Sequence, residues 1–296
     1  MFPDEFDYYE ATSVSEAIDL MGEHAGAETE LLAGGHSLLP AMKSGLSSPD
    51  VLIDIGEVEE LHGVEVDGDT LSIGAMTTYS DFIGEDISEE HAPALYHAVR
   101  QVGDTQVRNR GTLGGNLAHA DPASDLPGAA LATDATIVVT GPDGERRVSA
   151  DDFFFGMYAT DIGPDELVTR VEVPSAADAV GAYAKKPSPS SGYAMVGVCV
   201  QATVDGGTVT TVRVGANGVM DHGVRLEGVE DELAGESLDE DSIAAAADRA
   251  SEGLDTAMMM SDLQASAEFR EQLVGTYTRR ALERVLDRTA TPAAAD

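Results

Sequence analysis

The sequence RNRGTLGGNLAHADPASDL, at residues 108–126, is the stretch from which the fold and chemistry of this chain can best be predicted. Three glycines (Gly111, Gly114 and Gly115) stand there beside small hydroxyl and amide residues. Glycines let backbone N–H groups approach a ligand closely and converge on one concavity, which suits a phosphate group. A second glycine-rich turn, AGGHS, occurs at residues 33–37. We therefore expect both turns to hold one pyrophosphate.

The first 56 residues predict a small unit built around the AGGHS turn. A capping box and apolar residues at helical spacing predict a helix over residues 12–24. A short strand at 30–32 runs into the turn, a helical segment follows at 38–46, and VLIDI at 51–55 predicts a buried strand. Neither turn has the G-x-G-x-x-G spacing and no P-loop pattern occurs, so neither a Rossmann site nor a Walker ATPase is supported.

The next segment, from residue 57 to residue 175, predicts strands and short helices around the 108–126 stretch. The run ATIVVT, the turn GPDG and the run ERRVSA predict a hairpin over residues 135–150. Three consecutive phenylalanines, Phe153–Phe155, suggest core or partner-facing surface. Further strands are predicted at 70–76 and 166–174, and further helices at 77–83, 93–102 and 126–132.

The last segment, from residue 176, predicts an antiparallel sheet and two helices. A strand near residue 182 is interrupted by the flexible run PSPSS at 187–191, and a second hairpin follows over residues 195–218. Helices are predicted at 241–253 and 264–286. The second helix has basic residues near its C-terminal end, where the helix dipole favours positive charge. The end of the chain, TPAAAD, is expected to be disordered.

Composition excludes several classes of protein. No apolar run approaches the roughly 20 residues that span a membrane, and the acidic start MFPDEFDYYE lacks a signal-peptide pattern. We therefore expect a soluble, cytoplasmic protein. The single cysteine, Cys199, excludes an intrachain disulfide and a cysteine-held iron–sulfur cluster or zinc site in this chain. If electrons pass through such a cluster, another chain carries it.

The charge balance is strongly negative, with 54 Asp and Glu against 17 Lys and Arg and a net charge of −37. Such a field repels nucleic acid and anionic membranes. The acids are spread along the whole chain, so we interpret them as the solvated surface of a halophilic protein, where high salt screens their repulsion. Lysine is rare, with only Lys43, Lys185 and Lys186.

Both glycine turns resemble the flavin loops of a known family, the FAD-binding subunits of the molybdenum hydroxylases (the xanthine dehydrogenase/carbon monoxide dehydrogenase family). AGGHSLLPAMKSGL at 33–46 is similar to the family's first flavin loop, and VGDTQVRNRGTLGGNLAHADPASDLP at 102–127 is similar to its second. SDLQASAEFR at 261–270 resembles a segment near the end of the family's C-terminal domain. The resemblance therefore covers essentially the whole chain.

The resemblance implies an α+β fold with a PCMH-type FAD-binding region, as in vanillyl-alcohol oxidase. That region would consist of two α+β subdomains, followed by a small C-terminal α+β domain. On this sequence the subdomains correspond to residues 1–56 and 57–175 and the C-terminal domain to residues 176–290. Residues 291–296 would be a disordered tail.

The resemblance also implies which residues bind FAD. Val102 would lie near the adenine or the ring system, Asp125 near the sugar portion, and Leu167 would contact FAD through its backbone. Lys185 and Tyr193 match family positions near the flavin. The two loops would hold the pyrophosphate, and the second would also approach the flavin, through Ala33, Gly34, Gly35, His36, Ser37, Leu38, Thr112, Gly114, Gly115 and Asn116.

Charge supports this assignment independently of the resemblance. A pyrophosphate carries two negative charges, so a chain of net charge −37 needs local donors to bind it. The backbone N–H groups of two glycine turns can supply these donors. Positive side chains also fall near the two loops in the sequence, namely Lys43, Lys185, Lys186, Arg100, Arg108 and Arg110.

Other reactive or aromatic residues have simpler interpretations. His36 and His119 are possible acid–base groups, but we interpret them as hydrogen-bonding or packing residues, because the flavin here would pass electrons. No third residue completes a metal site with them, and we assign no catalytic residue. Tyr193 could be a core residue. Met258–Met260 could be core residues as well, or they could lie on a surface that faces a partner. Cys199 is expected to be inert in an apolar strand.

The function implied is that of an FAD-containing oxidoreductase subunit. Electrons would come from [2Fe-2S] clusters of a small subunit, beside a molybdopterin-binding large subunit, and leave for NAD or another acceptor. Two alternatives stay open: a self-contained flavin oxidoreductase acting on a small molecule, and a non-catalytic nucleotide-binding module. The sequence leaves the substrate of the complex, its final acceptor and the oligomeric state undetermined.

Overall fold

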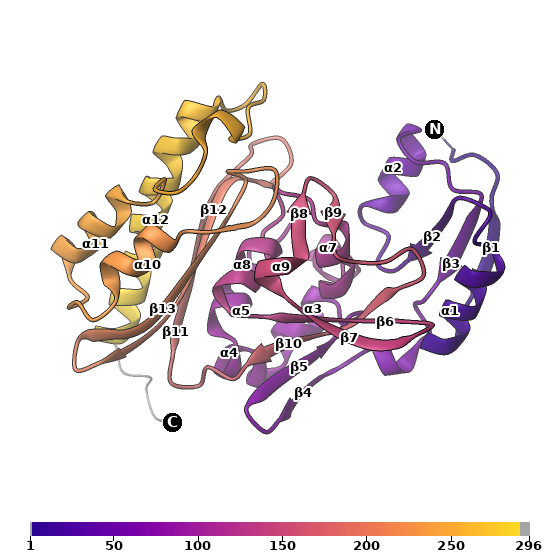
Figure 1. The fold of residues 1–296 in the computed structure, drawn as a ribbon, viewed down its shortest axis with the longest axis horizontal. Helices are drawn as coiled ribbons and strands as arrows, with labels where there is room; N and C mark the ends of the chain where they lie inside the picture. Colours follow the sequence, from indigo (N-terminus) through magenta and orange to yellow (C-terminus); the bar gives the residue numbers. More distant parts are fainter. Residues whose placement is uncertain (1, 291–296) are drawn as a thin grey trace.

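Three larger β-sheets and one two-stranded sheet, with helices packed on them, make up the fold in the computed structural model, which describes residues 2–290 (Figure 1). The predicted α+β class is confirmed, since helices and strands are mixed and every sheet after the N-terminal one is antiparallel. The predicted boundaries after residues 56 and 175 stay a prediction, although each sheet lies within one of the resulting ranges. The predicted tail at 291–296 lies outside the described residues. Among residues 2–290, no helix has the length and apolar character that crossing a membrane requires.

The N-terminal sheet is parallel, with β3 between β1 and β2 and with helices as the crossovers. Its middle strand is buried, as predicted for VLIDI. Because β2 and β3 run in the same direction, the glycine loop after β2 lies at the carboxyl edge of the sheet, where ligands bind in such units. The elements are β1 (Asp7–Glu10), α1 (Val14–Glu23), β2 (Thr29–Leu32), α2 (Leu38–Ser44), β3 (Val51–Asp54) and the 3₁₀ helix η1 (Glu59–Leu61).

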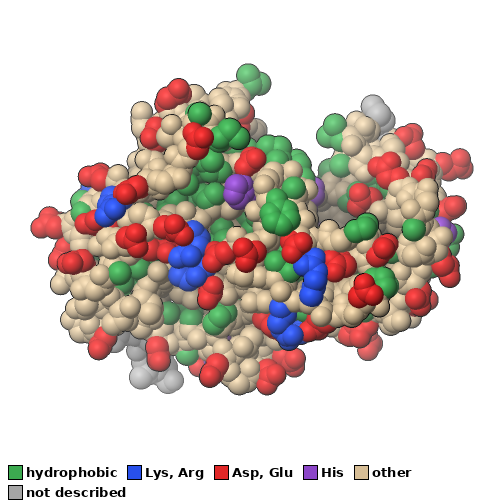
Figure 2. Space-filling view, viewed as in Figure 1, with side chains coloured by type: hydrophobic (Ala, Val, Ile, Leu, Met, Phe, Trp, Pro, Cys, Tyr) green, Lys and Arg blue, Asp and Glu red, His purple; other side chains and the backbone are tan. Residues whose placement is uncertain are grey.

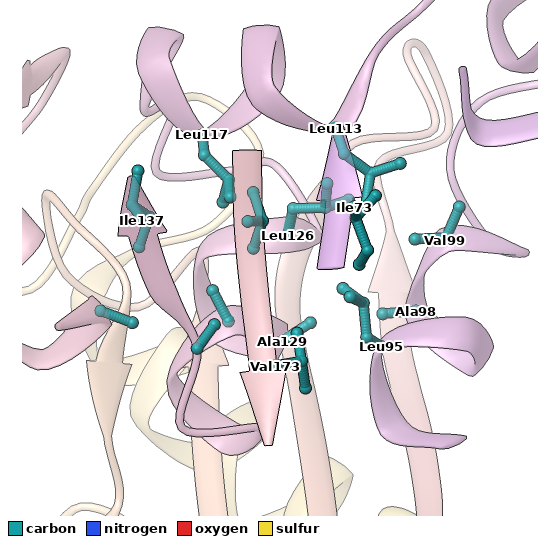
Figure 3. Close-up of a cluster of buried hydrophobic side chains, with 14 of the residues drawn as sticks. Ile73, Leu95, Ala98, Val99, Leu113, Leu117, Leu126, Ala129, Ile137 and Val173 are labelled. Carbon is teal, nitrogen blue, oxygen red and sulfur yellow. The ribbon is translucent and has the colours of Figure 1, made fainter. Parts of the chain in front are cut away.

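The middle sheet is antiparallel, in the order β4-β5-β10-β6-β7, and contains the predicted 135–150 hairpin. Leucines of α7 and α8 pack with Ile73, Ile137 and Val173 of this sheet in the largest core (Figure 3). Its strands are β4 (Val64–Asp67), β5 (Thr70–Gly74), β6 (Thr136–Gly141), β7 (Gly144–Ser149) and β10 (Leu167–Pro174), with the hairpin β8 (Phe154–Gly156) and β9 (Ala159–Thr160). Its helices are α3 (Tyr79–Gly84), α4 (Asp86–His91), α5 (Pro93–Val99), α6 (Thr105–Arg108), α7 (Leu113–His119), α8 (Leu126–Ala132) and α9 (Ala150–Phe153).

The C-terminal sheet has the order β11-β12-β13-β14, and the long helix α12 packs on β11 and β12. The predicted helix at 241–253 ends earlier, at Asp248, and the predicted helix at 264–286 runs from Ala267 to Ala290. The sequence prediction missed α10. The elements are β11 (Val180–Pro187), β12 (Ala194–Asp205), β13 (Thr208–Asn217), β14 (Val224–Arg225), α10 (Glu227–Leu233), α11 (Glu240–Asp248), the 3₁₀ helix η2 (Thr256–Met258) and α12 (Ala267–Ala290).

A helix, α7, occupies the part of the 108–126 stretch where the sequence predicts a ligand-binding turn. Thr112 caps it, and its side-chain oxygen accepts a hydrogen bond from the Gly115 N–H at 3.2 Å. Leu113 and Leu117, four residues apart, bury one face of the helix. The sequence pattern did not indicate a helix, because two adjacent glycines have low helix propensity. The packing of the leucines outweighs that low propensity.

The middle and C-terminal units share an interface in which α5 packs on β11 and α8 packs on β13. His97, on α5, is mostly buried there, with its Nε2 3.8 Å from a Glu89 carboxylate oxygen. Burial, with smaller contributions from Arg288, Arg100 and Arg284, lowers the pKa of His97 to about 4. The folded chain therefore holds this imidazole neutral at the interface.

His97 predicts an acid sensitivity of this interface. Because its folded pKa is lowered, its contribution to stability is complete above its unfolded pKa near 6.5 and is lost as the pH falls towards 4. The compared quantity is the free energy of unfolding of the wild type minus that of His97→Gln. We expect this difference to fall by roughly 2 kcal/mol between pH 7 and pH 4, allowing for partial solvent screening. Urea unfolding of both proteins at each pH measures this difference. Parallel pH curves would contradict the prediction.

Candidate cofactor-binding site

The first glycine loop, residues 33–38, leaves the carboxyl end of β2 and enters α2. Gly35 has a φ of +71°, in the left-handed region that glycine adopts without strain. Within the described residues, none of the backbone N–H groups of residues 34–38 donates a hydrogen bond to the rest of the chain. Backbone donors are ordinarily paired, so five consecutive open ones indicate a surface prepared for a ligand with several acceptor oxygens.

The second glycine segment, at the start of α7, provides close packing instead of open donors. The Gly114 N–H donates to the Ala75 carbonyl at 2.9 Å, and the Gly115 N–H is used by the Thr112 cap. A Cβ on Gly114 would lie 2.4 Å from the Ala75 Cβ, so glycine is required for α7 to sit against Ala75, directly after β5. The expectation that both glycine turns supply backbone donors is therefore wrong for these two amides.

The two glycine segments are nevertheless in direct contact, as the sequence predicts. A Cβ on Gly34 would lie 2.0 Å from the Arg110 carbonyl oxygen, and a Cβ on Gly115 would lie 3.4 Å from the Ala33 Cβ. The backbones approach so closely only because neither glycine has a side chain. The second segment thus forms the wall that fixes the shape of the first loop.

A cavity of about 250 Å³ opens beside this contact. Figure 2 shows the surface hollowed between the N-terminal unit and the middle of the molecule. The lining combines the first loop with the second segment, including Gly34, Gly35, Asn109, Arg110 and Thr112. The lining also includes the carboxylates of Glu10, Asp54 and Glu57, so the donors that suit a pyrophosphate lie on the glycine-loop side of the cavity, at the open amides and Arg110.

Asn116 is held in place by a hydrogen-bond network that the sequence does not reveal. Its Nδ2 donates to the Tyr79 hydroxyl at 2.8 Å, and its Oδ1 accepts from the Ser124 hydroxyl at 2.7 Å. Burial raises the pKa of Tyr79, so the phenol stays protonated. Both polar ends of Asn116 are engaged, so the residue ties α7 to α3 and to the turn before α8.

Asp125 and Lys185 form a buried ion pair across two units. Lys185 Nζ lies 2.8 Å from Asp125 Oδ2 and also donates to the Gln101 carbonyl at 2.7 Å. The Tyr183 hydroxyl donates to the other Asp125 oxygen. Burial raises the pKa of Asp125, while Lys185 and Tyr183 oppose that rise. Both predicted ligands of FAD thus bind each other and join the second segment to β11.

Tyr193 stands on the loop before β12 and is 42% exposed, so it is not core. Burial, with Asp121, Tyr158 and Asp125, raises the pKa of Tyr193, and the Ser37 side chain lowers it. The His119 and Tyr158 rings are in tilted contact, with centroids 5.0 Å apart. The structure therefore brings Tyr193 next to the first loop and next to a second aromatic pair.

The remaining predicted residues contribute in different ways. Val102 and Leu167 have buried side chains, so only their backbones could meet a ligand. His36 and Leu38 lie on the first loop, and His36 is exposed. Among residues 2–290, no three His, Cys, Asp or Glu side chains form a metal-binding group.

The cation cluster predicted around the site forms only in part. Arg110 lines the cavity, but Arg100 lies over the Tyr96 ring and Arg108 binds the Val102 carbonyl at 3.0 Å. Lys185 is engaged by Asp125. Proximity in sequence was a poor guide here, because Arg100 and Arg108 have partners within their own segment, the Tyr96 ring and the Val102 carbonyl.

The paired glycine segments and the open amides of the first loop are typical of the class of nucleotide-binding proteins. A family model described as the FAD binding domain in molybdopterin dehydrogenase matches residues 4–176, and one described as the CO dehydrogenase flavoprotein C-terminal domain matches residues 181–285. The chain belongs to the family of FAD-binding subunits of the molybdenum hydroxylases, and it is an oxidoreductase subunit with FAD as its cofactor.

Related proteins of known name align with nearly the full length of the chain. The carbon monoxide dehydrogenase medium chain of Hydrogenophaga pseudoflava is 38% identical and covers 98% of this chain and 100% of its own length. The glyceraldehyde dehydrogenase medium chain of Sulfolobus acidocaldarius is 36% identical, and the match covers 96% of this chain and 100% of that one. Among solved structures, carbon monoxide dehydrogenase from Hydrogenophaga pseudoflava gives a TM-score of 0.90 at 38% identity, covering 97% of this chain and 99% of its own. Quinoline 2-oxidoreductase from Pseudomonas putida 86 gives a TM-score of 0.90 at 31% identity, and the match covers 97% of this chain and 99% of that one.

Proposed function

We propose that this chain is the electron-transfer subunit of a molybdenum hydroxylase complex. It would take electrons from [2Fe-2S] clusters of a small partner subunit, beside a molybdopterin-binding large subunit, and pass them to NAD or another acceptor. The observation that carries the proposal is the row of open N–H groups on the first glycine loop, packed against the second glycine segment, in a chain whose single cysteine is buried and cannot hold a cluster. FAD, when bound, accepts electrons singly and releases them as a pair.

The first loop would bind the pyrophosphate through its open N–H groups, from Gly34 to Leu38. Backbone donors suit this task in a chain of net charge −37, because they bind an anion without a flexible side chain. Ala33 and Thr112 would complete the wall. Gly114, Gly115 and Asn116 would hold α7 in register with the loop.

Outside the loops, the predicted residues would position the site more than they contact the cofactor. The Asp125–Lys185 pair would fix the C-terminal unit against α8, which determines where Tyr193 stands. Tyr193 would flank the flavin, and the backbones of Val102 and Leu167 would contact FAD. We propose a cytoplasmic, halophilic complex, since the spread of acids fits a surface solvated at high salt.

Flavin content and flavin reduction test this function. The chain purified in high salt, or reconstituted with FAD, is expected to show a flavin absorption spectrum at about one FAD per chain. The flavin should be reduced when the complete complex receives substrate, but not when the isolated chain receives a small aldehyde or N-heterocycle. Absence of flavin after reconstitution would refute the cofactor role. Direct reduction of the isolated chain would favour a self-contained oxidoreductase.

A further inference from the structure

The segment SDLQASAEFR, at residues 261–270, resembles the family but contributes nothing to the cavity described above. It begins with a turn in which the Asp262 carboxylate accepts hydrogen bonds from the backbone N–H groups of Gln264 and Ala265, at 2.8 and 2.9 Å. It ends within α12 at Arg270, whose side chain is 3% exposed. A buried guanidinium requires acceptors for its N–H donors, so the partners of Arg270 indicate what the segment supports.

Arg270 connects this segment to the ends of two strands of the C-terminal sheet. Its Nη1 donates to the Met195 carbonyl and, at 2.5 Å, to the Gly218 carbonyl. Its Nη2 donates to Asp262 Oδ2 at 2.6 Å. Met195 lies at the start of β12 and Gly218 directly after β13. One cation therefore holds both strand ends against the first turn of α12.

The same strand ends are bound to the turn between α7 and α8. The Gly218 N–H donates to the Pro122 carbonyl at 2.7 Å. The Ala194 N–H donates to the Ala123 carbonyl at 3.0 Å. Pro122 and Ala123 follow the second glycine segment in the chain and belong to the stretch that predicts the cofactor site. Gly218 therefore binds the guanidinium through its carbonyl and this turn through its N–H.

Tyr193, which flanks the flavin in the proposed function, stands two residues before Met195. Its carbonyl accepts a hydrogen bond from the Ser188 N–H at 2.7 Å, which closes the β11–β12 loop on itself. The side-chain amide of Gln264 donates to the Ser190 hydroxyl of that loop at 3.3 Å. Because Tyr193 is 42% exposed, packing holds its ring only in part. The backbone at the start of β12 therefore sets the direction in which the ring points.

Stability alone does not require an arginine at this place. Apolar side chains of similar volume often replace buried ion pairs without loss of stability. Arg270 Nε has no hydrogen-bond partner among residues 2–290, and the Asp262 side chain is 46% exposed. A planar guanidinium, however, fits one arrangement of acceptors, and here two carbonyl groups and a carboxylate meet it. The arginine thus fixes a geometry and leaves one buried donor unpaired.

We propose that Arg270 is the positioning residue for Tyr193. This inference rests on the proposed function, in which Tyr193 flanks the flavin ring of FAD. The guanidinium fixes the start of β12 through the Met195 carbonyl, and the start of β12 sets the angle at which the Tyr193 ring meets the flavin. Arg270 is buried, and its bound donors point at the strand ends and at Asp262. It therefore acts on the flavin through Tyr193 and supplies no ligand of its own.

Fluorescence of bound FAD tests the proposal, because a tyrosine ring lying against a flavin quenches the flavin fluorescence by electron transfer. Arg270→Lys keeps the charge but loses the planar fork. We expect bound FAD in this variant to reach the fluorescence seen in Tyr193→Leu, and its Kd to rise roughly 2- to 10-fold, the worth of one aromatic contact. The double variant should be no brighter than Tyr193→Leu alone. The measurement is the fluorescence yield per bound FAD in the full chain reconstituted with FAD, after removal of free FAD.

Two further variants separate positioning from stability. Val285→Ala removes packing from a fully buried residue of α12, about 22 Å along the helix axis from Arg270. It should lower the midpoint of urea unfolding and leave the fluorescence at the wild-type level. Asp262→Asn weakens the hold on the guanidinium from a partly exposed position. This chain should fold, and its bound FAD should brighten by a smaller factor than in Arg270→Lys.

The outcomes distinguish the role of Arg270 from the proposed function. Brighter FAD in Arg270→Lys and Asp262→Asn, with wild-type fluorescence in Val285→Ala and no further rise in the double variant, supports the proposal. Wild-type fluorescence in a folded Arg270→Lys, or equal brightening in Val285→Ala, overturns it. If Arg270→Lys does not fold, unchanged fluorescence in Asp262→Asn overturns it. Wild-type fluorescence in Tyr193→Leu would refute the placement of Tyr193 and the proposal with it. A wild-type chain without flavin would instead contradict the proposed function.

Discussion

Gly34→Ala is expected to strip FAD from this chain although it adds a single methyl group. The new Cβ would lie 2.0 Å from the Arg110 carbonyl oxygen and 3.0 Å from the Gly111 Cα. Both contacts are with backbone, so no side chain can move aside. The first loop must then separate from the second segment, and the five open N–H groups no longer converge. Overpacking of this kind costs about 1–3 kcal/mol, or roughly 5- to 150-fold in Kd.

A titration of the apoprotein with FAD, followed by flavin fluorescence, measures this effect. Gly26→Ala is the control, because a Cβ on Gly26 meets nothing within 4 Å and the residue lies in the same N-terminal unit. We expect its Kd to equal that of the wild type and both variants to keep the wild-type circular dichroism spectrum. Wild-type FAD affinity in Gly34→Ala would show that the loop contact does not shape the site.

Lys185→Met is expected to be among the most destabilising single substitutions in the chain. Lys185 and Asp125 have side chains that are 7% and 5% exposed, so the substitution leaves a buried carboxylate without its cation. Breaking a buried ion pair from one side costs about 3–5 kcal/mol. The pair joins α8 to β11, and its loss should also loosen the contact between the middle and C-terminal units.

Denaturant unfolding of four variants, Lys185→Met, Asp125→Asn, their combination and Arg279→Met, separates this effect from a general loss of charge. The double variant Asp125→Asn/Lys185→Met should be less destabilised than the sum of its single variants, since no unpaired charge remains. Arg279→Met breaks the exposed Arg279–Glu283 pair on α12 and should change stability by less than about 1 kcal/mol. Equal effects of Lys185→Met and Arg279→Met would mean that burial of the pair is unimportant.

The strongest part of the prediction came from turns and strand patterns. The 108–126 stretch and the AGGHS turn indicated one shared site, and the structure places Gly34 against Arg110 and Gly115 against Ala33. Buried strands such as VLIDI and the 135–150 hairpin follow from local apolar patterns, which depend on few distant residues. These features could be predicted because each is encoded within a short stretch of sequence.

The roles of individual site residues were less predictable. Asp125 and Lys185 are sixty residues apart and meet only when the C-terminal sheet packs against α5 and α8, and each engages the other. Tyr79 supports Asn116 from a helix with no motif of its own. Nothing in the local sequence distinguishes a lysine that binds a ligand from one that neutralises a buried acid, because both need the same side chain.

By itself, the sequence determined that this chain has two glycine segments suited to a phosphate and that its single cysteine cannot hold a cluster. It also determined that acidic residues are spread along most of the chain. These are properties of composition and short-range pattern. Only the tertiary structure decided which glycine amides stay open, since the amides of Gly114 and Gly115 are consumed by Ala75 and Thr112. Hydrogen-bond partners and surface neighbours are set by packing between distant segments, which no local pattern records.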